Sequence, residues 1–118
     1  MNTQIALAGY FSIIAAFGSL AWSGLAVAGD PVRGATVFQA CAACHSTKAG
    51  QHMTGPSLAK VWQRKAGTVD AFQRYSEAMK RVDFVWTEAT LDPWLANPDK
   101  FIPGTSMTFQ GLRESKDR

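Results

Sequence analysis

The chain divides into an apolar stretch and a mixed stretch. Residues 1–28 contain no Asp, Glu, Lys or Arg, so the 12 basic and 9 acidic side chains all fall in residues 29–118. In the mixed stretch, apolar positions recur at helical spacing, and no alternation of apolar and polar positions is long enough for a strand. The pattern predicts an all-α domain over residues 29–118, preceded by an apolar leader over residues 1–28.

The first helix of the domain has a clear start. Asp30 is a good N-cap, and Pro31 is favoured at the first helical position. Apolar positions then recur at helical spacing as far as Cys41. The spacing predicts a short amphipathic helix over residues 31–41.

Further helices are expected in the second half of the domain. The pattern predicts one helical turn around residues 58–62, a short helix over residues 75–81, and a helix with Thr87 as its N-cap. Pro93 either kinks the last of these or moves its start to Asp92-Pro93. We expect Pro98 to end this region. Residues 101–109 are expected to form a loop with apolar ends, because Pro and Gly interrupt them.

The leader has two possible roles. It ends in Ala26-Val27-Ala28, a small-x-small site of the kind cut by signal peptidase, and Gly29-Asp30-Pro31 follows. Its uncharged run is also long enough for an uncleaved membrane anchor. A buried core helix is disfavoured because the remaining domain is too small to enclose it. Both roles predict a periplasmic domain that contacts the membrane only through residues 1–28, if these are not cleaved.

Composition narrows the class of protein. With 118 residues, 47% of them apolar, the chain is too short for several domains and too apolar for a disordered one. Two Cys residues cannot form a disulfide-dense fold, and a net charge of +3 without Lys or Arg runs gives no indication of nucleic-acid binding. A domain of about 90 residues has a marginal core, so a cofactor or metal is expected to supplement it.

The segment Cys41-Ala42-Ala43-Cys44-His45 carries the candidate chemistry. C-x-x-C-H is the signature of covalent c-type haem attachment, in which two thiols bond one edge of the porphyrin and the His binds the iron. A thioredoxin-type motif would need a βαβ pattern, which is not visible. A zinc site would need about four ligands, and His52 is the one further Cys or His. The motif therefore predicts one haem c per chain.

A second axial ligand is needed if the iron has no open position. The candidates are His52, Met53, Met79 and Met107. Met53 follows His45 too closely to reach the opposite haem face. Met79 falls in a predicted helix, where packing is the simpler role, and a His in a loop such as that of His52 more often hydrogen-bonds the backbone. Met107 is favoured because its loop is distant in sequence and flanked by apolar side chains, and a soft thioether stabilises ferrous iron.

The domain resembles class I cytochrome c of the mitochondrial and alphaproteobacterial type. The resemblance runs in order along nearly all of residues 29–118. The matching positions are Gly34-x-x-x-Phe38, CAACH at 41–45, Thr54-Gly55-Pro56, Arg64, Gly67, Tyr75-Ser76, Trp86, Leu91, Leu95, Asn97-Pro98, Ile102-Pro103-Gly104-Thr105, Met107, Phe109 and Gly111.

This resemblance implies a fold and a set of site residues. It implies a small class I cytochrome c fold of short helices and loops around one covalent haem, attached through Cys41 and Cys44. It further implies that His45 and Met107 are the axial ligands. The residues implied to hydrogen-bond the haem propionates are Arg64, Tyr75, Trp86 and Thr105.

Three features differ from the family pattern. The family continues past the Asp-Arg pair with an amphipathic helix packed across the first helix, so an uncovered face at Gly34 and Phe38 is expected here. Trp94 stands where the family usually has a Tyr. Ala40 and Ser106 stand where it often has Lys. The basic residues that remain for a docking face are Lys48, Lys60, Lys65, Lys100 and Arg113.

We therefore expect an electron-transfer protein and not an enzyme. The expected partners are a quinol–cytochrome c reductase and a terminal oxidase, reaction centre or dehydrogenase, with which a monomer would exchange single electrons. One alternative is a haem protein with an open or labile sixth position and peroxidase-like activity. Another is a fragment that is completed by a partner.

Overall fold

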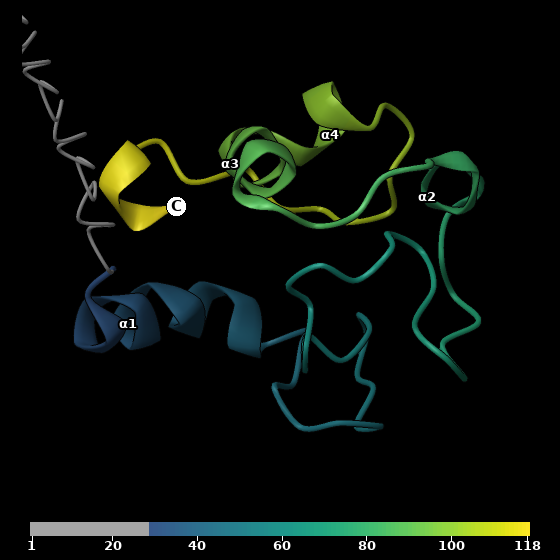
Figure 1. Ribbon diagram of the computed structural model, residues 1–118, viewed down its shortest axis with the longest axis horizontal. Coiled ribbons are helices and arrows are strands. Elements are labelled where there is room, and N and C mark those ends of the chain that lie inside the picture. Colours follow the sequence, from purple (N-terminus) through teal and green to yellow (C-terminus); the bar gives the residue numbers. More distant parts are fainter. Residues whose placement is uncertain (1–28) are drawn as a thin grey trace, which may run out of the picture.

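The computed structural model describes residues 29–118, and the predicted leader lies outside the described residues. The elements are α1 (Pro31–Ala42), α2 (Glu77–Arg81), α3 (Glu88–Ala96), α4 (Pro98–Phe101) and a 3-10 turn, η1 (Ser115–Asp117). The all-α prediction is confirmed for this part of the chain, in which one isolated bridge joins Lys65 and Val85. No helix within residues 29–118 is long and apolar enough to cross a membrane. Figure 1 shows the helices joined by long loops.

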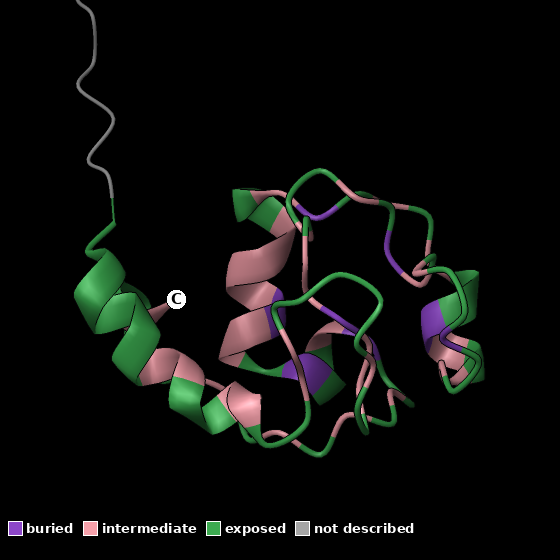
Figure 2. Ribbon diagram, turned by 90° about the horizontal axis from the view of Figure 1, so that it is seen from below, coloured by how far each residue is buried: buried purple, intermediate pink, exposed green. Residues whose placement is uncertain are grey.

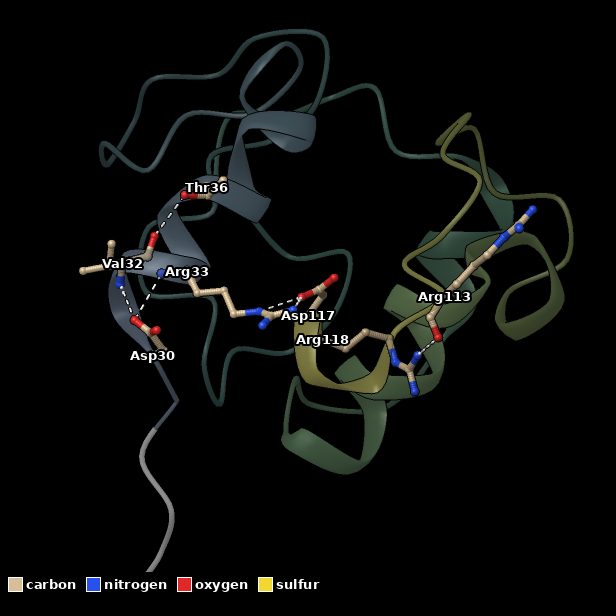
Figure 3. Close-up of polar contacts among 7 residues, drawn as sticks. All are labelled: Asp30, Val32, Arg33, Thr36, Arg113, Asp117 and Arg118. Atoms are coloured by element: carbon tan, nitrogen blue, oxygen red, sulfur yellow. Dashed lines mark hydrogen bonds and ion pairs between the residues drawn. The ribbon is translucent and has the colours of Figure 1, made fainter.

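Helix α1 begins where the sequence predicted. The side-chain Oδ1 of Asp30 accepts hydrogen bonds from the backbone N–H groups of Val32 (2.9 Å) and Arg33 (3.1 Å), and Pro31 fills the first helical position. Figure 3 shows these capping contacts. They satisfy two of the backbone donors that a helix start leaves without an intrahelical acceptor.

Helix α3 resolves the ambiguity around Pro93. The helix runs through Pro93 and starts after Thr87, whose N–H donates to Thr90 Oγ1 at 2.8 Å. The backbone of Thr87 also accepts from the N–H of Leu91 at 2.8 Å. The alternative start at Asp92-Pro93 is therefore wrong.

Pro98 starts a helix as well as following one. It occupies the first position of α4, and the Asn97 side chain caps this helix by accepting from the N–H of Lys100 at 2.9 Å. Phe101 therefore belongs to a helical turn and not to the predicted loop. Proline fits the first helical position because a backbone N–H there would have no acceptor within the helix. The predicted helix over 75–81 is present but shorter, with Ser76 as its N-cap.

The core lies among α2, α3, α4 and the loops between them. Its aromatic members touch in tilted or edge-on pairs: Trp86 and Trp94 have ring centroids 5.6 Å apart, and Phe84 lies 5.0 Å from Trp86. Such pairs contribute beyond their buried area. The buried cluster consists of Ala66, Met79, Trp86, Trp94 and Ile102.

Helix α1 lies apart from this core. Within the described residues it has no buried residue, and Figure 2 shows it in green and pink only. A Cβ added at Gly34 would meet no described atom within 4 Å. Between α1 and α3 lies a cavity of about 450 Å³, with Gly34 and Phe38 in its lining. Gly34 and Phe38 therefore border this cavity and are not part of the buried cluster.

The turn η1 connects α1 with α3. Asp117 forms an ion pair with Arg33 of α1, and the next residue, Arg118, pairs with Asp92 of α3 at 2.8 Å. Arg118 also donates to the backbone carbonyl of Arg113 at 3.1 Å, as Figure 3 shows. Two adjacent residues thus hold the two helices at one end of the cavity. The pKa of Arg118 is raised, chiefly by its hydrogen bond to Asp92.

Candidate functional site

The Cys-x-x-Cys-His segment begins in the last turn of α1 and continues past the end of that helix. The N–H groups of Cys44 and His45 both donate to the carbonyl of Cys41 at 3.0 Å, so the two thiols and the imidazole are held on one tight turn. Cys41 is half-buried and Cys44 is exposed, and the two do not form a disulfide with each other. Burial raises the pKa of the Cys41 thiol.

The imidazole of His45 is held at two points. Its Nδ1 lies 2.7 Å from the carbonyl oxygen of Pro56, a distance that suits an Nδ1–H donor and leaves Nε2 as the free ring nitrogen. Gly55 lies directly against the ring, since a Cβ there would come within 2.3 Å of His45 Cε1. The sequence showed Gly55 and Pro56 as family matches, but their role in orienting the imidazole was missed.

Met107 is presented by a tight turn. The N–H of Thr105 donates to the carbonyl of Ile102 at 3.0 Å, and Gly104 adopts a φ of +84°. Pro103 and Gly104 are the second and third residues of this turn. A type II turn favours Pro at the second position and needs Gly at the third because φ is positive there. The N–H of Met107 contacts Thr105 Oγ1 at 3.4 Å, and its side chain packs against the buried cluster.

Two cavities lie between the His45 turn and the Met107 loop. They measure about 140 Å³ and about 160 Å³. Cys44, His45, Met107 and Thr108 line both of them. His45 and Met107, which are more than sixty positions apart in the sequence, therefore border the same two cavities.

The remaining predicted site residues border the same region. Arg64, Trp86 and Cys41 line the cavity of about 450 Å³, and Thr105 lines the smallest one. Tyr75 lines both of these, which shows that they adjoin. The structure therefore brings all eight predicted site residues to three neighbouring cavities.

Arg64 carries an unused donor in this region. Its terminal nitrogens donate to the carbonyls of Ala59 (2.6 Å) and Ser57 (3.3 Å). Its Nε is buried and has no hydrogen-bond partner among the described residues. A buried guanidinium N–H without an acceptor is costly, so an anionic group in the adjoining cavity fits here.

Tyr75 also has a proton to donate. Its hydroxyl oxygen accepts from the N–H of Val69 at 3.3 Å, which leaves the O–H free. The pKa of Tyr75 is raised by burial, and the Val69 hydrogen bond and the charge of Arg64 oppose that shift. The hydroxyl thus stays protonated and can donate to an anion.

Two of the three other ligand candidates, His52 and Met53, line none of the three cavities. The N–H of Ser57 donates to His52 Nδ1 at 3.1 Å, so His52 Nε2 carries the proton that it donates to the carbonyl of Asp70 at 3.0 Å. As expected from the sequence, this imidazole hydrogen-bonds the backbone. Met53 is exposed, whereas Met79 is buried in the core and lines the cavities of about 140 Å³ and about 450 Å³ from that side.

The donor set fits a c-type haem. The turn supplies two thiols and an imidazole with a free Nε2, and the cavities have a buried cationic donor at their border. A zinc site is not supported, because no group of three or more His, Cys, Asp or Glu side chains in residues 29–118 could hold a metal ion. A Cys-x-x-Cys-His turn beside apolar cavities in a small helical domain defines the c-type haem proteins.

Comparisons with known proteins agree with this class. The cytochrome c family model matches residues 31–115. Cytochrome c2 of Rhodomicrobium vannielii is 44% identical over 102 residues, covering 85% of this chain and 81% of that protein. Cytochrome c2 of Rhodoblastus acidophilus is 47% identical over 92 residues, covering 77% and 85%. The solved structure of cytochrome cH from Methylobacterium extorquens matches with a TM-score of 0.69 at 37% identity, covering 75% and 89%.

The chain belongs to the cytochrome c family. It is an electron-transfer protein and not an enzyme, and it binds one covalent haem c per chain. The predicted resemblance, cofactor and class of activity are therefore confirmed.

Proposed function

We propose that this chain carries single electrons on a haem c bonded to Cys41 and Cys44, with His45 and Met107 as its axial ligands. The observation that carries the proposal is that His45, Met107 and Cys44 line the same two cavities. When bound, the haem supplies a one-electron ferric–ferrous couple. A Met ligand raises the potential of such a couple relative to harder ligands.

The residues around the cavities have distinct tasks. Pro56 and Gly55 fix the ring of His45 with Nε2 directed away from the hydrogen bond. The turn from Ile102 to Thr105 sets the position of Met107. Both proposed ligands would thus be held before an electron arrives, and a haem bound by both would leave no open position for a substrate.

Donors for the haem carboxylates come from four residues. Arg64 has an unused buried N–H, and Tyr75 has a free hydroxyl proton. Trp86 lines the cavity of about 450 Å³ together with Arg64 and Tyr75, and Thr105 lines the smallest cavity together with Tyr75. They can add an indole N–H and a hydroxyl. Buried carboxylates require donors or a cation of this kind.

The open-site alternative has less support. Met107 packs against the buried cluster, and its loop is closed by a backbone hydrogen bond. Both contacts favour a filled sixth position over a labile one. Cyanide or carbon monoxide should therefore bind the native protein slowly, and rapid binding would favour the peroxidase-like alternative.

We also propose a cellular setting and partners. Residues 1–28 act as a signal peptide cleaved after Ala28 or as an anchor, and residues 29–118 work as a monomer in the periplasm. The electrons pass between a quinol–cytochrome c reductase and a terminal oxidase, reaction centre or dehydrogenase. The relatives named cytochrome c2 support a bacterial carrier of this type. Mass spectrometry of the exported protein separates the two roles of the leader.

The ligand assignment is tested by Met107→Ala. Loss of the thioether should abolish the sulfur–iron absorption band and lower the potential by on the order of a hundred millivolts, within the ~0.8 V range that axial ligands set. Met53→Ala is the matched control, since Met53 is exposed and should leave both unchanged. A wild-type spectrum in Met107→Ala would show that another group binds the iron.

A further inference from the structure

The imidazole of His52 is held at both ring nitrogens, although it lines none of the three cavities. Its Nδ1 accepts from the N–H of Ser57 at 3.1 Å, and its Nε2–H donates to the carbonyl of Asp70 at 3.0 Å. The Phe72 ring lies beside it at a centroid distance of 5.7 Å. The nitrogen that faces Ser57 is therefore fixed as a hydrogen-bond acceptor.

The N–H that His52 accepts belongs to the peptide group that also contacts His45. The peptide bond between Pro56 and Ser57 carries both the Pro56 carbonyl, which lies 2.7 Å from His45 Nδ1, and the Ser57 N–H. Ser57 is 2% exposed, so this peptide group is largely shielded from water. We call the path from His52 through this peptide group to His45 the peptide relay.

The backbone at the far side of His52 is strained. Ala71 has a φ of +61°, in the left-handed region that residues with a Cβ rarely adopt. Such a conformation persists only where the surrounding structure holds it. The two neighbours of Ala71 are Asp70 and Phe72, which supply the carbonyl and the ring beside His52. The segment is thus bent into the shape that holds this imidazole.

We propose that His52 is a positioning residue that sets, through the peptide relay, how strongly His45 donates its Nδ1 proton. This inference rests on the proposed function, in which His45 Nε2 is the axial nitrogen. An amide that donates its N–H is more polarised, so its carbonyl is a better acceptor. A stronger hydrogen bond at Nδ1 makes the imidazole a more basic ligand, which favours the ferric state. His52 thus lowers the reduction potential from outside the cavities, and no proton is transferred along the path.

The proposal is tested by comparing His52→Leu with His52→Gln in the haem-loaded protein. His52→Leu removes the acceptor of the Ser57 N–H, so the ferric–ferrous equilibrium should shift about two- to fivefold toward the ferrous state. This shift is a rise of about 20–40 mV in the midpoint potential, at about 59 mV per tenfold change for one electron. A Gln amide can accept from Ser57 and donate to Asp70, so His52→Gln should restore at least half of the shift. An unchanged potential in His52→Leu, a fall, or equal shifts in the two variants would overturn the proposal.

Ser57→Ala separates this effect from a loss of stability. The Ser57 hydroxyl takes no part in the peptide relay: it donates to the Lys48 carbonyl at 2.6 Å and accepts from the N–H of Ala59 at 3.2 Å. Its removal should lower the denaturant midpoint but shift the ferric–ferrous equilibrium less than about 1.5-fold, because the backbone N–H and the Pro56 carbonyl remain. A shift as large as that in His52→Leu would mean that loosening of the loop, and not the peptide relay, sets the potential.

The NMR signal of the His45 Nδ1–H in the ferrous protein reports the hydrogen bond directly. A stronger hydrogen bond moves this proton signal to lower field, so His52→Leu should move it to higher field and His52→Gln should return it toward the wild-type position. Haemochrome and sulfur–iron bands are recorded for the wild type and every variant. Their absence in the wild type would refute the proposed ligation, whereas intact bands with an unmoved His45 signal in His52→Leu would refute the peptide relay alone.

Discussion

Helix α1 and the segment from Trp86 to Ile102 border the same cavities, but different forces hold them. The later segment supplies Trp86, Trp94 and Ile102, each at most 7% exposed, to the buried cluster. Within the described residues, α1 supplies none, and an ion pair through Arg33 links it to η1. Cofactor attachment at Cys41 in α1 and at Cys44 just after it would add covalent connections to this weakly packed helix, whereas the Met107 side depends on its core.

The largest expected effect is a core truncation on the Met107 side. Ile102→Ala should lower the free energy of unfolding of the haem-loaded protein by about 2–5 kcal/mol, because it removes buried methyl groups and leaves a cavity. Val37→Ala in α1, where Val37 is half-buried, should cost below about 1 kcal/mol. Denaturant titration compares the two. Similar losses would mean that α1 is packed as tightly as the core.

The next largest effect concerns the His45 turn. Gly55→Ala should cost about 1–3 kcal/mol, because the new methyl group would overlap the His45 ring, and the haem absorption bands should shift with it. Gly34→Ala is the matched control. Its methyl group meets no described atom within 4 Å, so a better helix former should stabilise α1 by about 0.5–1 kcal/mol. Destabilisation by Gly34→Ala would indicate that something covers this face.

A smaller effect is expected at the start of α1. Asp30→Ala removes the acceptor of two backbone N–H groups and should cost about 1 kcal/mol by denaturant titration. Gln39→Ala, in the exposed last turns of the same helix, should be close to neutral. If Asp30→Ala were also neutral, the covalent connection to the haem alone would keep α1 folded.

The smallest effect concerns the exposed pair of Lys65 and Asp83. The hydrogen bond from Lys65 and its charge lower the pKa of Asp83. The stabilisation is therefore present above the unfolded pKa of about 3.9 and is lost as the pH falls through the lower folded value. Unfolding curves of wild type and Lys65→Gln should converge as the pH falls from about 5 to about 3. A difference that grows instead would mean that Asp83 is not the titrating partner.

Local signals in the sequence predicted much of this arrangement. The Asp30-Pro31 start, the Cys41 to His45 turn and the Pro-Gly loop before Met107 each depend on a few neighbouring residues, and all three are present. The start of α3 was ambiguous because Thr87 and Asp92-Pro93 both carry start signals. The hydrogen bond from the Thr87 N–H to Thr90 decides between them.

Other features depend on contacts between distant segments. Two examples are the close approach of Gly55 to His45 and the hydrogen bond that Arg74 donates to the Met53 carbonyl. Neither contact produces a periodic pattern in the sequence. The position of the lysines relative to the cavities likewise follows from the path of the loops. Composition could supply the number of positive charges but not their distance from the site.

The two contacts that fix the ring of His45, with Pro56 and with Gly55, also affect the rate of electron exchange. An electron that arrives at or leaves the metal changes its charge by one, and surrounding groups that are free to move would have to rearrange at each step. A ring that is already fixed, together with a Met107 that packs against the core, would have little to rearrange. With the proposed ligands, the chain would have a low reorganisation energy, so electron exchange could remain fast even when the driving force between its partners is small.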